Sequence, residues 1–600
     1  MKGGVRQRFG KLAARPMEPE GFRSAKLYGS VAEWCWGKSS APDLLKRFLH
    51  DRDDAAALKQ ILPADMASVT NSKTKAAALH NAHRIIMKYV KTHFSDWTGM
   101  VRHVNGPQIQ KFLPPTAFLG KLCSNYPEKA RMMLGYWPDT IRQFWTGLYS
   151  SRQGRLMWRD HTFLRGKRPE DLLNCLPAVI HEDAGPASKQ LSPTILNISS
   201  VLAMGGELDI KIVIAVYDKI TGPEGKVATD DLSWAAILED LEVLASGHWP
   251  LGPWAPGTER HRQAGKPVMV LDDTAIGLIP LWGKADGEHA TVGWNLQSYN
   301  AGDDVCHKCN ANRTTRPFTR LTSECKSDFT KVEILSRLEE PVHPLMASRF
   351  FNRQFNPVDM MHTNDCNGII GIVAGQVFAT LIKTCMALGN TVDERLAELN
   401  RRLQVHYTKF HVQYRIGGPL KRANLYLGSE GESFPGLHGP AIKAASCRAI
   451  LPFVQEVTDM YISGSDQQST STRKVVCSLN EFVRIVYASE MFLAEAAKTS
   501  LFLHARRFNR HFQWLASDCQ VRGEVGWHIT WKVHCLIHLA EQCMFINCRF
   551  IQNYIEEGLV GKIVPVTKSC LGGRRTEERL QQKVLEKYSV GIMLRCEGFD

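Results

Sequence analysis

The hydrophobic periodicity of this 600-residue chain changes twice, and that change limits its fold more than any other feature. From about residue 31 to 166, apolar residues recur at intervals of three and four, as in Ala82, Ile85, Ile86 and Val90, which is typical of helices. Residues 176–282 instead carry short apolar runs, and the helical pattern returns from about 306 to 540. We therefore expect one sheet between long helical regions, in a chain of roughly two to four domains.

The apolar runs between 176 and 282 predict the strands of a mixed α/β sheet. Three runs follow one another directly, and two more come after a segment with helical spacing that Gly247 ends. The strand-like runs are 176–183, 194–202, 208–217, 268–271 and 278–282, and the helical segment is 230–244. Strands followed by a helix and further strands favour a mixed α/β fold.

These patterns divide the chain into four regions. Residues 1–170 are predicted to be an α-helical region with a basic arm at 1–16, and 171–305 to be the first part of the sheet domain. A mostly helical insertion at 306–540 follows, and 541–600 supplies a closing helix and the end of the sheet domain. Within the insertion, the polar stretch SGSDQQSTST at 463–472 predicts a mobile linker.

The composition of the chain indicates which kind of partner it binds and in which cellular compartment it functions. The 74 Lys and Arg residues exceed the 60 Asp and Glu residues by 14, which favours a polyanionic partner such as nucleic acid. No run of about 18 apolar residues is present, and the first residues lack a signal-peptide core, so we expect an intracellular protein without a membrane segment. The 16 scattered Cys residues favour reduced thiols over disulfides.

Carboxylates stand where three of the predicted strands end. They are Asp183, the pair Asp272 and Asp273, and Asp286. Acids on neighbouring strands of one sheet can hold hard cations through oxygen, because carboxylates are charged oxygen ligands. The alternative is that each acid caps a helix or starts a turn.

Cysteine and histidine pairs suggest a second kind of metal site. Cys306 and Cys309 form a CxxC pair, which can supply half of a zinc site or can be ordinary turn thiols. His362 is our preferred third ligand, with Cys325 and Cys366 as alternatives. In a separate segment, His534, His538 and Glu541 share a helical face; this HxxxHxxE pattern can bind a metal, but we interpret the histidines as core residues.

A basic and aromatic segment is the candidate nucleic-acid contact. Arg506, Arg507 and Arg510 alternate with Phe508 and Phe512, a mixture suited to phosphates and stacked bases, or equally to a basic helix face over a core. Lys562, at the end of the segment NYIEEGLVGK, is added to this set.

Four segments together resemble one family. VIHEDAGP around Asp183, WGKAD ending at Asp286, the CHKCNAN segment and NPVDMMHTNDCNGIIG are similar to segments of the transposases of CACTA-type (En/Spm) DNA elements. Asp183 and Asp286 are 103 residues apart, which is similar to the interval between the first two catalytic acids of that family. The resemblance extends over about residues 176–595.

This resemblance implies an RNase H-like fold interrupted by a helical insertion. It implies an acidic triad of Asp183, Asp286 and Glu557 that binds two Mg²⁺ or Mn²⁺ ions, with Glu556 as the alternative third acid. Asp359 and His362 match the family's acid-x-x-His motif, which lies beside the metal ligands.

The function that the resemblance implies is a nuclear DDE-type transposase, or a protein derived from one, that cuts and joins double-stranded DNA at element ends and target. The resemblance leaves open whether Cys306 and Cys309 bind zinc. It also leaves open whether the protein forms homo-oligomers. Two alternatives are a catalytically dead, domesticated DNA-binding protein and an RNase H-like nuclease without strand transfer.

Overall fold

The structure is a computed structural model, and the chain in it forms two compact units, 1–102 with 562–600, and 103–561. This division cuts through the regions 1–170 and 541–600 that the sequence suggested. The basic arm at 1–16 lies outside the described residues. The described residues are 25–44, 75–104, 106, 109–188, 191–218, 231–285, 294, 305–321, 331–335, 342–426, 432–571 and 576–599.

The smaller unit is helical where it is described. Helix α24 (Glu577–Cys596) packs against α1 (Ala25–Cys35) and α6 (Ser95–Thr98), and α5 (Lys75–His93) precedes α6. Trp36 and Tyr588 meet edge to face at 6.2 Å between ring centroids, and the Lys587 ammonium lies 3.7 Å from the Trp34 ring centroid. Aromatic packing therefore joins the two ends of the chain in this unit.

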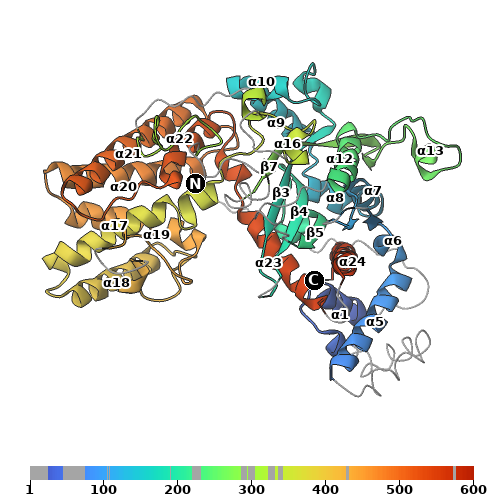
Figure 1. Ribbon diagram of the computed structural model, residues 1–600, viewed down its shortest axis with the longest axis horizontal. Coiled ribbons are helices and arrows are strands. Elements are labelled where there is room, and N and C mark those ends of the chain that lie inside the picture. The colour runs from blue at the N-terminus through green and yellow to red at the C-terminus, as the bar shows by residue number, and fades with distance from the viewer. Residues whose placement is uncertain are drawn as a thin grey trace. The chain divides into compact units, whose positions relative to one another are not determined.

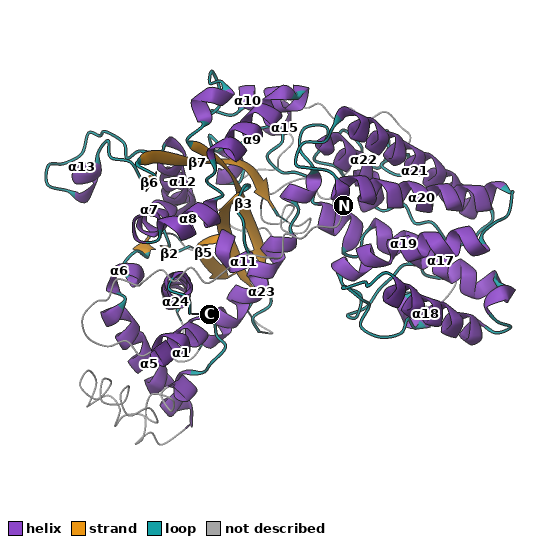
Figure 2. Ribbon diagram, turned by 180° about the vertical axis from the view of Figure 1, so that it is seen from behind, coloured by secondary structure: helices purple, strands orange, loops and turns teal. Residues whose placement is uncertain are grey.

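The larger unit contains the predicted mixed sheet (Figure 2). Its strand order is β5-β4-β3-β7-β6. Strands β3, β4 and β5 pair antiparallel, β7 pairs parallel to β3, and β6 pairs antiparallel to β7. The bounds are β3 Cys175–Ala184, β4 Pro193–Ser200, β5 Ile212–Asp218, β6 Met269–Leu271 and β7 Thr274–Lys284. The mixed α/β prediction is confirmed.

Strand β5 is shorter than predicted, because α11 (Glu207–Ile210) takes the first part of the run. The Asp209 carboxylate accepts a hydrogen bond from the Gly206 backbone N–H at 3.1 Å, which favours a helical turn over an extended chain. The apolar residues from Ile212 onward then continue as a buried strand.

Helices pack on the sheet and are linked to it and to one another by hydrogen bonds. Helix α12 packs on β7, and α7 packs on β6. The Asp240 carboxylate of α12 accepts the Thr116 backbone N–H of α7 at 3.0 Å, and the Trp145 indole of α9 donates to the Cys175 carbonyl at 2.8 Å. These helices are α7 Pro115–Asn125, α8 Pro127–Leu134, α9 Pro138–Ser150, α10 Arg152–Asp160 and α12 Asp231–Ser246.

The predicted insertion is a bundle of long helices with its own apolar core (Figure 1). Phe378, Phe453 and Phe508 are among the side chains buried in that core. The helices are α17 Ile369–Thr384, α18 Val392–Lys409, α19 Ala444–Tyr461, α20 Gln467–Ala488, α21 Glu495–Val521 and α22 Trp531–Cys543, after the π-helical turn η2 Met361–Asp365. Then η5 (Cys548–Ile551) leads to α23 (Tyr554–Ser569).

The prediction of a mobile linker at 463–472 is wrong, because helix α20 begins within this stretch, at Gln467. The Asp466 carboxylate accepts the Ser469 backbone N–H at 2.8 Å and caps the helix, and Ser471 and Thr472 are buried. The polar composition therefore marks a capped helix start.

One segment of the described chain, Met361–Thr384, has the length and apolar composition of a membrane span, with a mean hydropathy of 1.5. Most of that segment is buried inside the protein, as is usual for a core helix.

Short elements complete the described fold. They are β1 Arg102–His103, β2 Lys111–Phe112, α13 Glu259–Gln263, α15 Lys331–Leu335, α16 Pro344–Ala347, η1 Pro169–Leu172, η3 Met386–Leu388 and η4 Arg422–Asn424.

Candidate active site and metal centre

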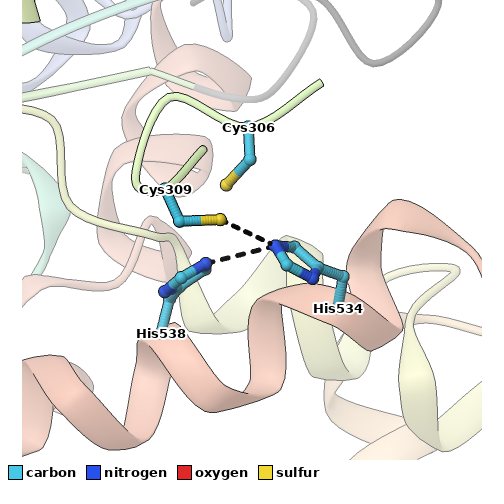
Figure 3. A group of neighbouring side chains, drawn as sticks. All are labelled: Cys306, Cys309, His534 and His538. Atoms are coloured by element: carbon cyan, nitrogen blue, oxygen red, sulfur yellow. Dashed lines mark hydrogen bonds between the residues drawn. The ribbon is translucent and has the colours of Figure 1, made fainter. Parts of the chain in front are cut away.

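Two cysteines and two histidines from distant parts of the chain converge in a buried group. Cys306 and Cys309 lie in a loop at the start of the insertion, and His534 and His538 lie one turn apart on α22 (Figure 3). One ligand atom from each residue lies within 4.8 Å of all the others. Cys309 Sγ is 3.3 Å from His534 Nε2, and the two histidine Nε2 atoms are 3.2 Å apart.

This donor set fits a structural zinc site. Tetrahedral Zn²⁺ with bonds of about 2.0–2.3 Å places its ligand atoms roughly 3.3–3.8 Å apart, close to the separations seen here. The Glu541 carboxylate contacts His538 Nδ1 at 2.8 Å, which leaves Nε2 to face the group. The four residues could therefore hold a metal such as zinc, with Glu541 orienting one ligand.

Electrostatics in the group favour a ligand in its thiolate form. Burial opposes charge on Cys306, but hydrogen bonding with Cys309 and Cys535 and the nearby His538 hold the pKa of its thiol well below the usual value. Burial lowers the pKa of His538, while Cys306 and Glu541 raise it more strongly, to about 10. Because metal binding needs thiolate sulfur and neutral imidazole, loading this group would release protons.

The sequence-based choice of the remaining zinc ligands was wrong. His362 contacts Asp359 and Glu557, and neither it nor Cys366 belongs to the Cys/His group. Cys325 lies outside the described residues. The HxxxH pair was the signal that could have pointed to the other two residues, but we interpreted these histidines as core residues, and the 225-residue separation of His534 from Cys309 gave no reason to join the two halves.

The predicted acidic site begins at the carboxyl end of β3. Asp183 is the penultimate residue of that strand, is 6% exposed and accepts the Ala184 backbone N–H at 2.7 Å. The neighbouring parallel strand β7 ends at Lys284, two residues before Asp286 in the sequence. Asp286 itself lies outside the described residues.

The other strand-end acids lie away from Asp183. Asp272 and Asp273 form the tight turn between β6 and β7, with φ of 51° and 59°. Asp and Asn tolerate this left-handed backbone, which hairpin turns of this kind require. The turn precedes β7, so these acids lie at the opposite end of the strand from Lys284.

Glu556 is buried against the sheet by two lysines. Its Oε1 atom lies 2.6 Å from the Lys211 ammonium and 2.5 Å from that of Lys284, and the side chains are 2–5% exposed. Burial opposes ionisation of Glu556, but Lys211 and Lys284 hold its pKa far below the usual value. Burial lowers the pKa of Lys211 to about 8, against the opposing charge of Glu556. Sequence analysis missed both lysines, since each belongs to an unremarkable apolar run.

Glu557 points to a different neighbour. Its side chain is 38% exposed, and Oε1 lies 3.5 Å from His362 Nε2. The other nitrogen of that ring, Nδ1, lies 2.6 Å from the Asp359 carboxylate. Asp359, His362 and Glu557 therefore form a chain of contacts from the buried insertion to the first turn of α23.

Two acids of the insertion hold the start of α23 in place. The Asp359 carboxylate accepts the backbone N–H groups of His362 and Asn553, at 2.9 and 2.8 Å, and it also contacts His362 Nδ1 at 2.6 Å. The buried Asp365 carboxylate accepts the Tyr554 hydroxyl at 2.7 Å and pairs with Arg448 at 3.0 Å. Burial raises the pKa of Asp365 to about 7.

The candidate nucleic-acid residues divide between the units. Arg506, Arg507 and Arg510 lie on α21, while Phe508 and Phe512 are fully buried in the core beneath them. Lys562 is exposed on α23, in the smaller unit. Base stacking on the two phenylalanines is therefore excluded.

Comparison of the chain with protein-family models and with curated proteins finds no match.

Proposed function

We propose that this protein is a DDE-type transposase, or a protein derived from one, that cuts and joins DNA phosphodiester bonds. The observation that carries the proposal is that the first turn of α23 packs at the carboxyl end of the parallel β3 and β7 pair. There Glu556 pairs with Lys284 of β7 and with Lys211, which is 345 residues away in sequence. Asp183, the expected first acid, lies on β3, and Glu557, the expected third acid, lies in the first turn of α23.

Strand geometry supports Asp183 and α23 sharing one face of the sheet. Directly opposite residues of paired strands point to the same face, and residues two apart do so along a strand. His181 is opposite Lys284, and Asp183 is two residues further along β3. Since Lys284 contacts Glu556 of α23, the face that carries Asp183 is the one that α23 covers.

The pairing of Glu556 favours Glu557 as the third acid. A carboxylate held by two ammonium groups lacks the negative charge that a divalent cation needs from its ligand. Adjacent helical residues point about 100° apart, so Glu557 faces elsewhere, and it contacts His362 instead of a lysine. Asp359 orients His362, and His362 in turn positions Glu557.

The mixed sheet with a central parallel pair is compatible with an RNase H-like core, which supports the proposal further. Asp183, Asp286 and Glu557 would hold Mg²⁺ or Mn²⁺, which supplies activation of the attacking oxygen and stabilisation of the leaving oxygen when bound. The side chains of this chain contribute hard ligands, their orientation through Asp359 and His362, and positive charge for the DNA. Nuclear localisation and homo-oligomerisation belong to the same proposal.

The test is a cleavage and joining assay with the full-length protein on duplex DNA that carries the sequences flanking its gene. With Mg²⁺ or Mn²⁺, Asp183→Asn, Asp286→Asn and Glu557→Gln should each lower cleavage at least 100-fold without weakening DNA binding. Asp273→Asn, which changes an acid at the opposite end of β7, is the matched control and should cut normally.

The products also separate the alternatives. Cutting without joining would identify a nuclease on the same fold, and DNA binding without cutting would identify a catalytically dead, domesticated protein. Normal cutting by both Asp183→Asn and Glu557→Gln would refute the acidic site.

A further inference from the structure

The paired helices α20 and α21 carry a row of cations on their outer surface. The helices lie side by side in the bundle (Figure 1), and α20 supplies Lys474 and Arg484 while α21 supplies Arg507 and Arg510. Arg507 is partly exposed and the other three are exposed. Only the α21 members were part of the sequence prediction, because the α20 members are remote in sequence and lack an aromatic pattern.

The surroundings of two histidines of α21 show how the row is aligned. His511 Nδ1 lies 3.2 Å from the Ser471 hydroxyl, which brings the start of α20 beside the second half of α21. Burial, then Lys474, Arg510 and Arg507, lower the pKa of His511. Burial, Arg507 and Arg484 likewise lower the pKa of His504, against Glu481. Arg507 is therefore the middle member, with Arg484 on one side and Lys474 with Arg510 on the other.

The two α21 members of the row, Arg507 and Arg510, differ from the cations near the ends of that helix, which have acidic partners. Near the ends of the helix, Lys498 pairs with Glu495 at 2.7 Å, and Arg522 pairs with Asp518 and Glu524, both at 3.0 Å.

Within the part of the chain that the structure describes, no carboxylate forms an ion pair with Lys474, Arg507 or Arg510. Arg484 pairs with Glu481 at 2.7 Å and is the partly neutralised member. Unpaired cations gathered from two helices form a surface suited to an anionic partner.

The length and chemistry of the row fit a nucleic-acid backbone. Ten residues separate Lys474 from Arg484 on one helix, which corresponds to about 15 Å. At about 3.4 Å of axis per phosphate, one strand of a duplex presents roughly four phosphates over this length. Phe508 and Phe512 are buried beneath the row, so the surface offers charge without a platform for stacking bases.

We propose that the α20 and α21 row binds the phosphate backbone of duplex DNA, independently of sequence. The choice of DNA rests on the proposed function, while the row itself rests on charge and geometry alone. The surface lies on the helical insertion and uses none of the acids that the cleavage proposal requires.

The experiment measures binding of the full-length protein to a random 30-base-pair duplex as salt is varied, without added Mg²⁺ or Mn²⁺. The triple variant Lys474→Gln, Arg507→Gln, Arg510→Gln should lose at least tenfold in affinity at 0.1 M salt. The slope of log affinity against log salt should become shallower by about 2 to 3, since each lost phosphate contact changes it by about 0.9.

The matched control changes the same charge at cations that already have acidic partners. Lys498→Gln, Arg522→Gln and Arg401→Gln together remove three such cations, and the slope should change by less than about 1. Arg507→Lys with Arg510→Lys should keep the wild-type slope, because the charge is retained. Unchanged thermal unfolding and zinc content would show that the triple variant is folded.

A triple variant that binds like the control would overturn the proposal, as would a wild-type protein that prefers single-stranded DNA or RNA to the duplex. The two proposals fail separately. A protein that binds through the row and never cuts DNA refutes the cleavage proposal alone, and one that cuts but binds elsewhere refutes only the row.

Discussion

At the scale of single residues, the most informative contact is the burial of Glu556 between Lys211 and Lys284. Two ammonium groups removed from water need a carboxylate partner, since burial of an unpaired charge costs several kcal/mol. The same pairing distinguishes Glu556 from Glu557, whose partly exposed side chain contacts His362. The two adjacent glutamates thus have different partners: Glu556 pairs with two lysines, and Glu557 contacts a histidine.

Glu556→Gln is expected to lower the free energy of unfolding by about 3–5 kcal/mol, because both lysines lose their counterion. The pKa of Glu556 is depressed in the folded state, so its contribution is fully present above the unfolded value of about 4.3 and is lost as the pH falls below it. Urea unfolding from pH 7 to pH 3 measures both effects.

In the same titration, the difference in unfolding free energy between the wild type and Glu556→Gln should become smaller as the pH falls. Glu557→Gln is the control, and its unfolding free energy should stay within about 0.5 kcal/mol of wild type, as is usual at exposed sites. Equal stability of the two variants would contradict the structural role of the buried ion pair.

At the scale of elements, the first turn of α23 is positioned from outside itself. Asp359 accepts the Asn553 backbone N–H, and Asp365 accepts the Tyr554 hydroxyl, so the acid-x-x-His segment of the insertion anchors the helix that carries Glu557. Burial opposes charge on Asp359, but its hydrogen bonds and the nearby His362 hold its pKa below the usual value. The ionised carboxylate is thus the anchoring form.

Asp359→Asn should loosen this anchor, because the amide replaces the charge and one of the two acceptor oxygens. Hydrogen bonds to a charged group contribute about 1.5–3 kcal/mol, and a loss in this range is expected. Backbone amides of the first turn of α23 should exchange hydrogen faster, measured by mass spectrometry, while those of β3 and β4 stay unchanged. Exchange that is faster everywhere, or nowhere, would argue against a local anchor.

At the scale of the whole molecule, the Cys/His group closes the helical insertion at its base. Cys306 and Cys309 lie where the insertion leaves the sheet region, and His534 and His538 lie on α22, shortly before the chain returns through η5 to α23. A metal at this point would join the two ends of the insertion across 225 residues of sequence. Such a bond stabilises only the folded arrangement.

Zinc removal by a chelator, or His538→Ala, is therefore expected to speed hydrogen exchange in residues 305–321 and in α22, and to leave the exchange of β3 and β4 unchanged. Metal analysis should find one zinc per chain in the wild type and a loss of at least tenfold in affinity in the variant. His504→Ala, on the neighbouring helix, should retain the metal. Purified protein without zinc and without a response to a chelator would return the four residues to ordinary packing.

Sequence by itself determined the local parts of this protein. Alternation and β-branched runs predicted the strands β3, β4 and β7, and helical spacing after Asp231 predicted α12, because periodicity reports which face of an element is buried. The CxxC spacing, which is also local, suggested Cys306 and Cys309 as half of a metal site, with ordinary turn thiols as the alternative. At 463–472, composition misled, since one capping carboxylate at Asp466 outweighed the polar content.

The tertiary structure alone decided what depends on contacts between remote segments. It joined Cys306 and Cys309 to His534 and His538, and it placed Glu556 between Lys211 and Lys284, leaving Glu557 beside His362. No periodicity encodes such pairs, because their distance is set by how sheet and helices pack and not by spacing along the chain. Residue types could therefore be chosen from the sequence, and their partners only from the fold.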